Sequence, residues 1–336
     1  MMRFFTFAAF LTPLFLTSAC KDGPTRLPNS IGKAGEVAIV MDKPNWEGEM
    51  GASFRTTLAA DYPGLPQREP MFTLLSVPHN AFNALFQSHR NLIVVHIPSP
   101  DFQEAQMVIQ ENVWATPQIV ITFTGPSVSE ILACFDQQKD RVINAIEQAE
   151  RNRVITRSKR YEEKTLRLLV NESFGGSPRF PQDYFLKKQE KNFIWISRET
   201  TNTLQGVLVY SYPYVDETSL SKEVILRECR AVMRHQVPGT LENTYMIFSP
   251  ALEPTFRWVH YKNNDFGEMR GLWEVEKDFM GGPFVAHLYL DAKNRRVLVL
   301  HAFVYAPRYD KRNYVRQIES ILYSFDWEEE ADSLPD

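Results

Sequence analysis

Two histidines near the C-terminal end of the chain have the spacing that best suits chemistry. His287 and His301 lie on neighbouring apolar segments that read as the two strands of one hairpin. A turn made of residues 293–295 would place the histidines directly opposite each other, with Asp291 on the same face because strand side chains alternate. Paired imidazoles near a carboxylate are typical of a metal site or a proton relay. The prediction depends on the turn, since a one-residue slip moves His301 to the other face.

The alternative is that the two histidines simply pack within a half-buried sheet. Val299 and Phe303 share the predicted face of His301, so its surroundings would be apolar. The sequence also lacks the usual catalytic signatures: G-x-S-x-G, H-E-x-x-H, a P-loop, C-x-x-C and G-x-G-x-x-G. No reaction and no cofactor can therefore be named from motifs.

A second candidate site surrounds a Gly-Gly-Pro turn just before the hairpin. Its members are the turn and the aromatic and methionine side chains around it: Trp273, Phe279, Met280, Gly281, Gly282, Pro283 and Phe284. Paired glycines let another chain approach the backbone closely, and aromatic and methionine side chains are enriched at recognition surfaces. The pattern predicts an exposed rim that binds a partner; the alternative is a tight turn with its aromatics anchored in the core.

Three arginines on one expected helix are a candidate anion-binding face. Arg227, Arg230 and Arg234 align opposite the apolar stripe of the segment 220–234. A row of guanidinium groups suits a carboxylate, a phosphate or an acidic polysaccharide. A solvated basic face explains the same pattern without any ligand.

Another basic cluster lies where the last expected helix begins. Arg308, Lys311 and Arg312 stand close to its N-terminus, where cations work against the helix macrodipole. Asp310 compensates only in part. A cluster placed there at an electrostatic cost indicates an anionic partner.

The elements that would position these residues follow from hydrophobic periodicity. In the N-terminal half we expect strands over 36–42, 71–77, 92–97, 107–111 and 118–124, helices over 54–60 and 81–87, and a long helix capped by Ser127. In the C-terminal half we expect strands over 193–197, 206–212, 244–248, 257–261, 271–275, 284–290 and 297–305, and helices over 220–234 and 310–325. The predicted fold class is α+β, with mixed or antiparallel sheets packed against helices in two halves.

The same patterns divide the chain into six segments. They are a lipoprotein signal peptide (1–19), a flexible tether (20–35), an N-terminal α/β domain (36–150), a helical connector (151–170), a C-terminal α+β domain (171–327) and an acidic tail (328–336). The charged stretch that begins at residue 151 either continues the long helix or connects the two domains.

The N-terminal segment has the features of an export signal that ends at a lipid-bearing cysteine. Arg3 precedes an apolar run over residues 4–16, and the small residues 17–19 come directly before Cys20. The run is shorter than the roughly 20 apolar residues that span a bilayer, which favours a cleaved signal. We therefore expect Cys20 to be acylated; the alternative is ordinary cleavage after Ala19.

The composition limits the size of the fold, the classes of partner and the state of the cysteines. The chain has 336 residues, of which 44% are hydrophobic, so it is long enough for two domains with substantial cores. Its formal net charge of −4 gives no electrostatic reason to bind nucleic acid. Cys134 and Cys229 each fall within a helical pattern, and we expect two free buried thiols rather than a disulfide.

Several segments of the C-terminal half resemble the DUF4837 family. They are Met269–Val275 (MRGLWEV), Phe279–Phe284 (FMGGPF), Tyr305–Pro307 (YAP) with Lys311 and Arg312, and Asn192–Trp195 (NFIW) after Pro181 and Tyr184. The resemblance runs from the signal to about Trp327. It implies an uncharacterised lipoprotein of Bacteroidetes-type bacteria and a location in the cell envelope. The family carries no assigned activity, so the resemblance transfers no catalytic residue.

These observations lead to two hypotheses of function. The first is a non-enzymatic binding or assembly module, held by its lipid on Cys20 at the outer membrane, on the periplasmic or surface side. Its partner would be an envelope protein or an anionic glycan, and not nucleic acid. The alternative is an envelope hydrolase or metal-dependent enzyme that uses His287 and His301.

Overall fold

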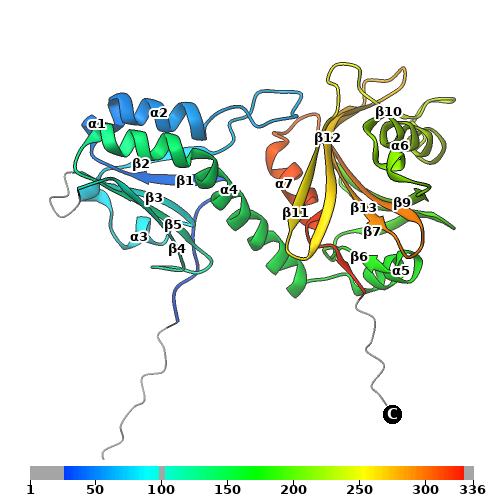
Figure 1. Ribbon diagram of the computed structural model, residues 1–336, viewed down its shortest axis with the longest axis horizontal. Coiled ribbons are helices and arrows are strands. Elements are labelled where there is room, and N and C mark those ends of the chain that lie inside the picture. The colour runs from blue at the N-terminus through cyan, green and yellow to red at the C-terminus, as the bar shows by residue number, and fades with distance from the viewer. Residues whose placement is uncertain (1–25, 98–102, 329–336) are drawn as a thin grey trace, which may run out of the picture.

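The structure is a computed structural model that describes residues 26–97 and 103–328. The predicted signal peptide, Cys20, the first part of the predicted tether, and residues 329–336 of the predicted tail lie outside the described residues. Two domains lie side by side and are joined by a long helix (Figure 1). The predicted fold class is confirmed: both domains combine helices with mixed or antiparallel sheets.

The N-terminal domain is built on a five-stranded sheet in the order β2-β1-β3-β5-β4. Its elements are β1 (Glu36–Val40), α1 (Lys43–Glu47), α2 (Glu49–Leu58), β2 (Thr73–Val77), the 3-10 helix η1 (His79–Ala81), α3 (Ala84–Gln87), β3 (Asn91–His96), β4 (Gln106–Glu111), β5 (Ile119–Thr124) and α4 (Val128–Arg160). β1 runs parallel to β2 and β3, β3 runs parallel to β5, and β4 is antiparallel to β5.

Both faces of this sheet are covered, which explains why β1, β3 and β5 are nearly continuous apolar runs. One face packs against α2 and α4, where the rings of Phe54 and Phe135 stack with centroids 4.0 Å apart. The other face packs against Phe82 and Phe86 of the segment around α3 and against Trp114 of the β4–β5 connection. Ser127 caps α4 by accepting a hydrogen bond from the backbone N–H of Glu130, as the sequence predicted.

The domain begins earlier than the predicted residue 36. Within the described part of the predicted tether, Asn29 forms a β-bridge with Thr116, and Ile31 forms one with His89. The hydroxyl of Ser30 also donates to the carbonyl of Pro117 at 2.8 Å. These contacts hold the entering chain against the N-terminal domain.

The C-terminal domain is built on an eight-stranded antiparallel sheet in the order β10-β12-β13-β14-β9-β8-β7, with β11 also paired to β12. Its elements are α5 (Lys164–Phe174), β6 (Gly176–Ser177), β7 (Phe185–Glu190), β8 (Phe193–Glu199), β9 (Leu204–Pro213), the 3-10 helix η2 (Glu217–Leu220), α6 (Lys222–Gln236), β10 (Met246–Phe248), β11 (Thr255–Tyr261), β12 (Asn264–Val275), β13 (Gly281–Asp291), β14 (Arg296–Tyr305), α7 (Arg312–Leu322) and β15 (Asp326–Trp327). The sequence did not predict the charged edge strand β7, the short strands β6 and β15, the 3-10 helix η2, or α5 as a separate helix.

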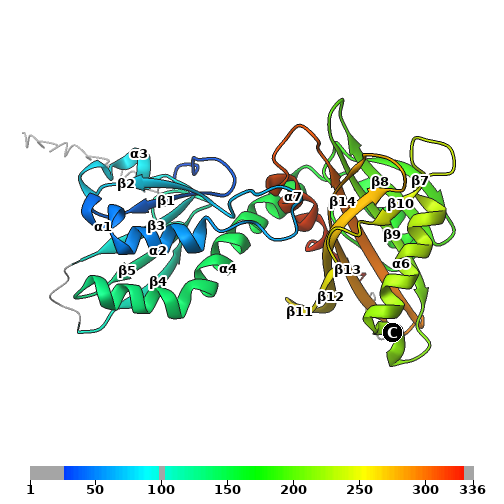
Figure 2. The same ribbon diagram turned by 90° about the horizontal axis from the view of Figure 1, so that it is seen from above.

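Helices also cover both faces of this second sheet. α6 lies against the face that points away from the N-terminal domain, whereas α7 lies between the sheet and that domain (Figures 1 and 2). Both cysteines are free thiols; Cys229 of α6 is buried as expected, whereas Cys134 of α4 is only half-buried. Within the described ranges, no helix has both the length and the apolarity required to cross a membrane.

Two segments of the N-terminal domain reach the C-terminal domain. Helix α4 is 33 residues long and runs through the predicted boundary at residue 150 to contact α7. The loop 59–72, between α2 and β2, also extends to α7 (Figure 1) and places Tyr62 in the core of the C-terminal domain. The two domains therefore share one hydrophobic cluster.

The β13–β14 hairpin does not have the predicted register. Asp291 pairs with Arg296, so the turn comprises residues 292–295, and Ala286 rather than His287 lies opposite His301. The side chain of Asp291 accepts hydrogen bonds from Asn294 and Arg296, which closes the longer turn. This one-residue difference places His287 and His301 on opposite faces of the sheet.

Candidate functional site

The N-terminus of α7 is capped by a carboxylate from the other domain. Glu69, in the loop 59–72, accepts a hydrogen bond from the backbone N–H of Lys311 at 2.6 Å and another from that of Arg312 at 2.8 Å. The guanidinium of Arg312 also donates to the carbonyl of Pro70. Glu69 supplies both a cap and a negative charge at the positive end of the helix dipole. The anionic partner that the sequence predicted for this basic cluster is thus, at least for Lys311 and Arg312, part of the same chain.

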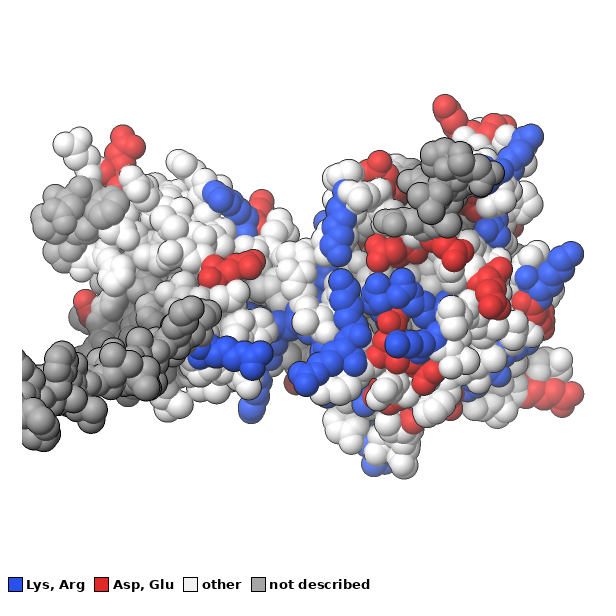
Figure 3. All heavy atoms as spheres, turned by 90° about the horizontal axis from the view of Figure 1, so that it is seen from below, with Lys and Arg blue, Asp and Glu red and all other residues white. Residues whose placement is uncertain are grey.

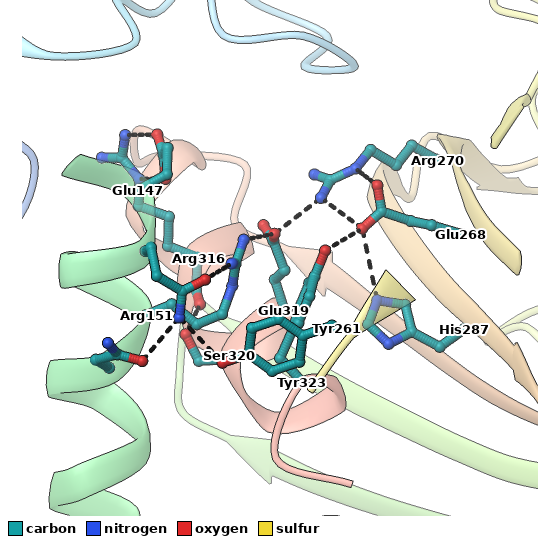
Figure 4. Close-up of polar contacts among 12 residues, drawn as sticks. Glu147, Arg151, Tyr261, Glu268, Arg270, His287, Arg316, Glu319, Ser320 and Tyr323 are labelled. Carbon is teal, nitrogen blue, oxygen red and sulfur yellow. Dashed lines mark hydrogen bonds and ion pairs between the residues drawn. The ribbon is translucent and has the colours of Figure 1, made fainter. Parts of the chain in front are cut away.

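A network of buried charges joins α4, α7 and β12 (Figure 4). Glu319 of α7 accepts a hydrogen bond from Arg151 of α4 at 2.8 Å and forms an ion pair with Arg270 of β12 at 2.9 Å. Arg270 also binds Glu268, whose carboxylate accepts a hydrogen bond from the Tyr323 hydroxyl at 3.0 Å. Both carboxylates are almost completely buried.

The arginines keep the buried carboxylates ionised. Burial by itself would raise the pKa of Glu319, but Arg270 and Arg151 outweigh it and lower that pKa to about 2. Burial also opposes ionisation of Glu268, and His287 and Arg270 hold the pKa of that carboxyl well below its usual range. Charges that are buried, paired and hydrogen-bonded in this way hold two elements in one arrangement. The network fixes α4 of one domain against α7 and β12 of the other.

A second ion pair strengthens the same junction. Arg316 of α7 binds the carboxylate of Glu147 on α4, with its Nε 3.0 Å from Oε2, and donates to the carbonyl of Met71 at 2.7 Å. Burial would lower the pKa of Arg316, but Glu147 outweighs it and raises that pKa. The Tyr62 hydroxyl lies 3.4 Å from Glu319. Helix α7 therefore contacts both α4 and the loop 59–72 through polar side chains.

The predicted metal pair is not formed. His287 faces the buried network, with Nε2 3.6 Å from a carboxylate oxygen of Glu268. His301 lies on the opposite face against the rings of Phe248 and Phe284, and neither of its ring nitrogens has a hydrogen-bond partner among the described residues. No group of three or more metal-binding side chains occurs within the described ranges. Because the two histidines lie on opposite faces of the sheet, they cannot form the shared site that the alternative hypothesis of an enzyme requires.

Burial lowers the pKa of both histidines. It lowers the pKa of His301 to about 3, because nothing near the ring compensates for desolvation of the charged form. Burial also lowers the pKa of His287, although the neighbouring Glu268 opposes the shift. Both imidazoles are neutral at pH 7. Asp291, the predicted third member, binds Arg296 at 2.8 Å instead.

The predicted aromatic rim is also wrong for most of its members. Trp273 is 2% exposed and Phe284 is 1% exposed, because both point into the core under α6. Met280 is half-buried against the same core, and Pro283 is buried. Of the aromatic side chains in this group, Phe279 alone is exposed.

Close strand packing explains the paired glycines. A Cβ on Gly282 would lie 2.0 Å from the carbonyl oxygen of Val304, and one on Gly281 would lie 2.8 Å from that of Trp273. The indole N–H of Trp273 donates to the same Val304 carbonyl at 3.2 Å. The Gly-Gly segment serves the core of the domain, which is the alternative that the sequence left open.

The α6 arginines lie where the sequence placed them, on the exposed face of the helix. Arg227 forms an ion pair with Glu228, while Arg230 and Arg234 lie over the rings of Phe248 and Tyr245. Pairing and ring contacts account for each of the three guanidinium groups. None of the three lines the cleft between the domains.

A cleft of about 950 Å³ opens where the two domains meet. Its wall on the N-terminal side consists of the β4–β5 connection and the last turns of α4, and its wall on the C-terminal side consists of residues 181–184, Arg198 and part of α7. The charged side chains that line it are Glu111, Arg153, Arg157, Arg160, Asp183 and Arg198. Lys and Arg side chains gather where the domains meet on the face shown in Figure 3. The volume is in the range of small-molecule binding sites, which occur preferentially at domain interfaces.

Apart from Lys311 and Arg312, the sequence did not indicate the residues that build this junction. Glu69 lies 242 residues before its partner Lys311, and Arg151 lies 168 residues before Glu319. Contacts across such separations leave no periodic signal. The only available clue was the cluster of cations at the start of α7, which implied an anion without identifying it.

The fold and this junction define a two-domain α+β protein whose domains are joined through buried ion pairs. Residues 163–324 match the model of the domain of unknown function DUF4837, so the C-terminal domain belongs to that family. Residues 30–159 match a different model, the domain of unknown function DUF8532. The predicted resemblance is thus confirmed for the C-terminal domain, and the N-terminal domain matches a family of its own.

Comparisons with solved structures include the following distant likenesses. The Ran-binding protein Mog1p of Saccharomyces cerevisiae is 8% identical with a TM-score of 0.32, over 46% of this chain and 90% of that chain. The human StarD13 lipid transfer and protein localization domain is 12% identical with a TM-score of 0.22, over 48% of this chain and 95% of that chain. TM-scores of this size carry no argument about function. Comparison with curated proteins found no match.

Proposed function

We propose that the protein is a lipid-anchored cell-envelope protein that acts as a non-enzymatic binding module, with the interdomain cleft as its ligand site. The observation that carries the proposal is the fixed junction around the cleft. The Glu319 network, the Arg316–Glu147 ion pair and the Glu69 cap hold the two walls in one arrangement. A cleft whose walls do not need to reorganise loses less free energy on binding.

The anchor in this proposal is an acyl group on Cys20. The support for it is the sequence before that residue, where a short apolar run and small residues precede the cysteine. An anchored binding module would work at the membrane surface, at the outer membrane of the envelope. Stable anchoring requires more than one acyl chain, as a bacterial lipoprotein would carry.

The anchor is tested by fractionating cells that produce the wild-type chain or the Cys20→Ala variant. We expect wild-type protein in the membrane fraction, with acyl mass on its N-terminal peptide. The Cys20→Ala variant should lack acyl mass and leave the membrane fraction. Wild-type protein that is soluble and unacylated would contradict the anchor.

The ligand site is tested by filling the cleft. Thr156 lies on α4, is exposed and lines the cleft, so Thr156→Trp should occlude it without disturbing the core. Asn144→Trp, on an exposed position of the same helix outside the cleft, is the matched control. We expect native mass spectrometry of protein extracted from its own membranes to show a bound molecule on wild type and on the control but not on Thr156→Trp. Equal retention by all three proteins would contradict the assignment of the cleft.

A further inference from the structure

We propose that the interdomain cleft binds an acidic oligosaccharide through Arg157 and Arg160, with the ring of Tyr161 as a stacking surface. This inference rests on the proposed function, because it assigns a chemical class to the ligand of the same cleft. Three observations support it: the excess of positive charge in the cleft, the lack of ion-pair partners for two of its arginines, and the uncharged polar and aromatic groups that also line it.

The lining of the cleft differs in charge from the chain as a whole. Four arginines line it, against one glutamate and one aspartate, whereas the whole chain has a net charge of −4. A local excess of positive charge at a concave junction attracts anions, because low-dielectric walls concentrate the field. The excess indicates a negatively charged ligand.

Two of the four arginines have internal ion-pair partners. Arg153, at the floor, binds Glu150 at 3.1 Å and the side chain of Asn91 at 2.8 Å. Arg198 forms an ion pair with Asp183 at 2.6 Å. Burial nevertheless lowers the pKa of Arg153 to about 10, which Glu150 only partly opposes. An anion placed in the cleft would stabilise this charge further.

The other two arginines are available to a ligand. Within the described ranges, the side chains of Arg157 and Arg160 form no ion pair and no hydrogen bond, and both residues are exposed. They lie on the last turns of α4, so both guanidinium groups are carried by a rigid element. Binding an anion here breaks no existing ion pair. Guanidinium groups bind carboxylates in a bidentate manner that also fixes their orientation.

The remaining lining groups fit a carbohydrate. Tyr161 is 48% exposed, and the guanidinium of Arg160 lies 5.4 Å from the centre of its ring. An exposed aromatic ring offers an apolar face for a sugar, and its edge can still reach water. Gln182 and Thr156 also line the cleft, and neither side chain has a hydrogen-bond partner among the described residues. Amides and hydroxyls of this kind suit the hydroxyl groups of a saccharide.

The experiment is isothermal titration calorimetry of the full-length protein in detergent, with trigalacturonic acid and a hyaluronan tetrasaccharide as probes. Maltotriose is the uncharged comparison, and hexaglutamate is the acidic peptide comparison. The test variant is Arg157→Gln/Arg160→Gln. The matched control is Lys159→Gln/Lys164→Gln, which removes two exposed cations from the same stretch of chain outside this cleft. Circular dichroism melts confirm that each variant folds.

We expect at least one acidic saccharide to bind wild type and the Lys159→Gln/Lys164→Gln control alike, and to bind Arg157→Gln/Arg160→Gln about tenfold or more weakly, the loss expected for charge-assisted hydrogen bonds. Maltotriose should bind wild type much more weakly than the acidic saccharide that binds. The inference is overturned if neither acidic saccharide binds, if both variants lose affinity equally, or if hexaglutamate binds better than the saccharides.

The two proposals fail in different ways. If Thr156→Trp loses a retained molecule but the acidic saccharides do not bind, the cleft is a ligand site and the assigned ligand class is wrong. If Thr156→Trp retains whatever wild type retains, the cleft itself is not the site.

Discussion

Glu69 caps helix α7, which begins at Arg312. Its carboxylate accepts a hydrogen bond from the backbone N–H of Arg312 at 2.8 Å, although 243 residues separate the two in the chain. The contact crosses from the N-terminal to the C-terminal domain. It makes the start of α7 depend on a loop of the other domain, so the two domains should lose stability together when the contact is removed.

The first prediction concerns this cap. Glu69→Ala should lower the free energy of unfolding by about 1–2 kcal/mol, because two backbone donors at the helix start lose their acceptor. Hydrogen exchange should accelerate at the first turn of α7. Chemical denaturation measures the stability, with Glu172→Ala, an exposed glutamate on α5, as the control. Equal effects of the two substitutions would contradict a specific capping role.

The second prediction concerns the buried carboxylate of Glu319. Glu319→Gln should destabilise the protein by about 3–5 kcal/mol, because it leaves Arg151 and Arg270 buried beside a neutral side chain. Removing the arginine on the other domain, by Arg151→Met, should cost less, since Glu319 keeps Arg270. Denaturation curves of both variants measure this order. A reversed order would show that Arg270 alone does not hold Glu319.

The third prediction is the acid dependence of the same network. The pKa of Glu319 falls from its ordinary 4.5 to about 2 in the folded protein, so the folded state binds its proton less readily than the unfolded state. Its contribution to stability is therefore complete above about pH 4.5 and is lost as the pH falls toward 2. Stability measured across this window should fall less steeply in Glu319→Gln than in wild type. Parallel slopes would count against the assignment.

The fourth prediction concerns His301. Burial lowers its pKa from 6.5 to about 3, so the unfolded chain takes up a proton below pH 6.5 while the folded protein does not. Stability should decrease by about 1.4 kcal/mol per pH unit from this group between those values. His301→Leu should remove that component and, by deleting an imidazole without partners, raise stability at pH 5.

Unfolding of wild type and His301→Leu at several pH values measures this difference. His235→Leu, which changes an exposed histidine on α6, is the control, because its side chain meets water before and after unfolding. A pH dependence that His301→Leu leaves intact would mean that this ring takes up a proton within the folded protein.

The fifth prediction tests the role of the paired glycines. Gly282→Ala should destabilise the protein by about 3 kcal/mol, because the new methyl group would meet the carbonyl of Val304 in a packed core. Gly64→Ala should cost about 1 kcal/mol, since a Cβ there meets open space and only its positive φ is unfavourable. Thermal unfolding compares the two. A mild effect at Gly282 would reopen the possibility that this segment is exposed and adaptable.

In the β13–β14 hairpin, the sequence predicted the two strands but not the register in which they pair. The apolar runs located β13 and β14 within a few residues of their observed bounds. The pairing of His287 with His301 required the length of the turn, and the side chain of Asp291 sets that length by binding Asn294 and Arg296. A single residue in the turn decides which face of the sheet each histidine occupies, and periodicity contains no information about it.

The sequence by itself determined the helices and strands with strong hydrophobic periodicity, the start of α4 at Ser127, the exposed arginine face of α6 and the family of the C-terminal domain. These properties depend on residues close together in the chain. Only the tertiary structure decided that Trp273 and Phe284 are buried, that Glu69 is the anion at the start of α7, and that Arg157 and Arg160 line a cleft. Those outcomes depend on distances between segments far apart in sequence, which are set when both domains pack around α4 and α7.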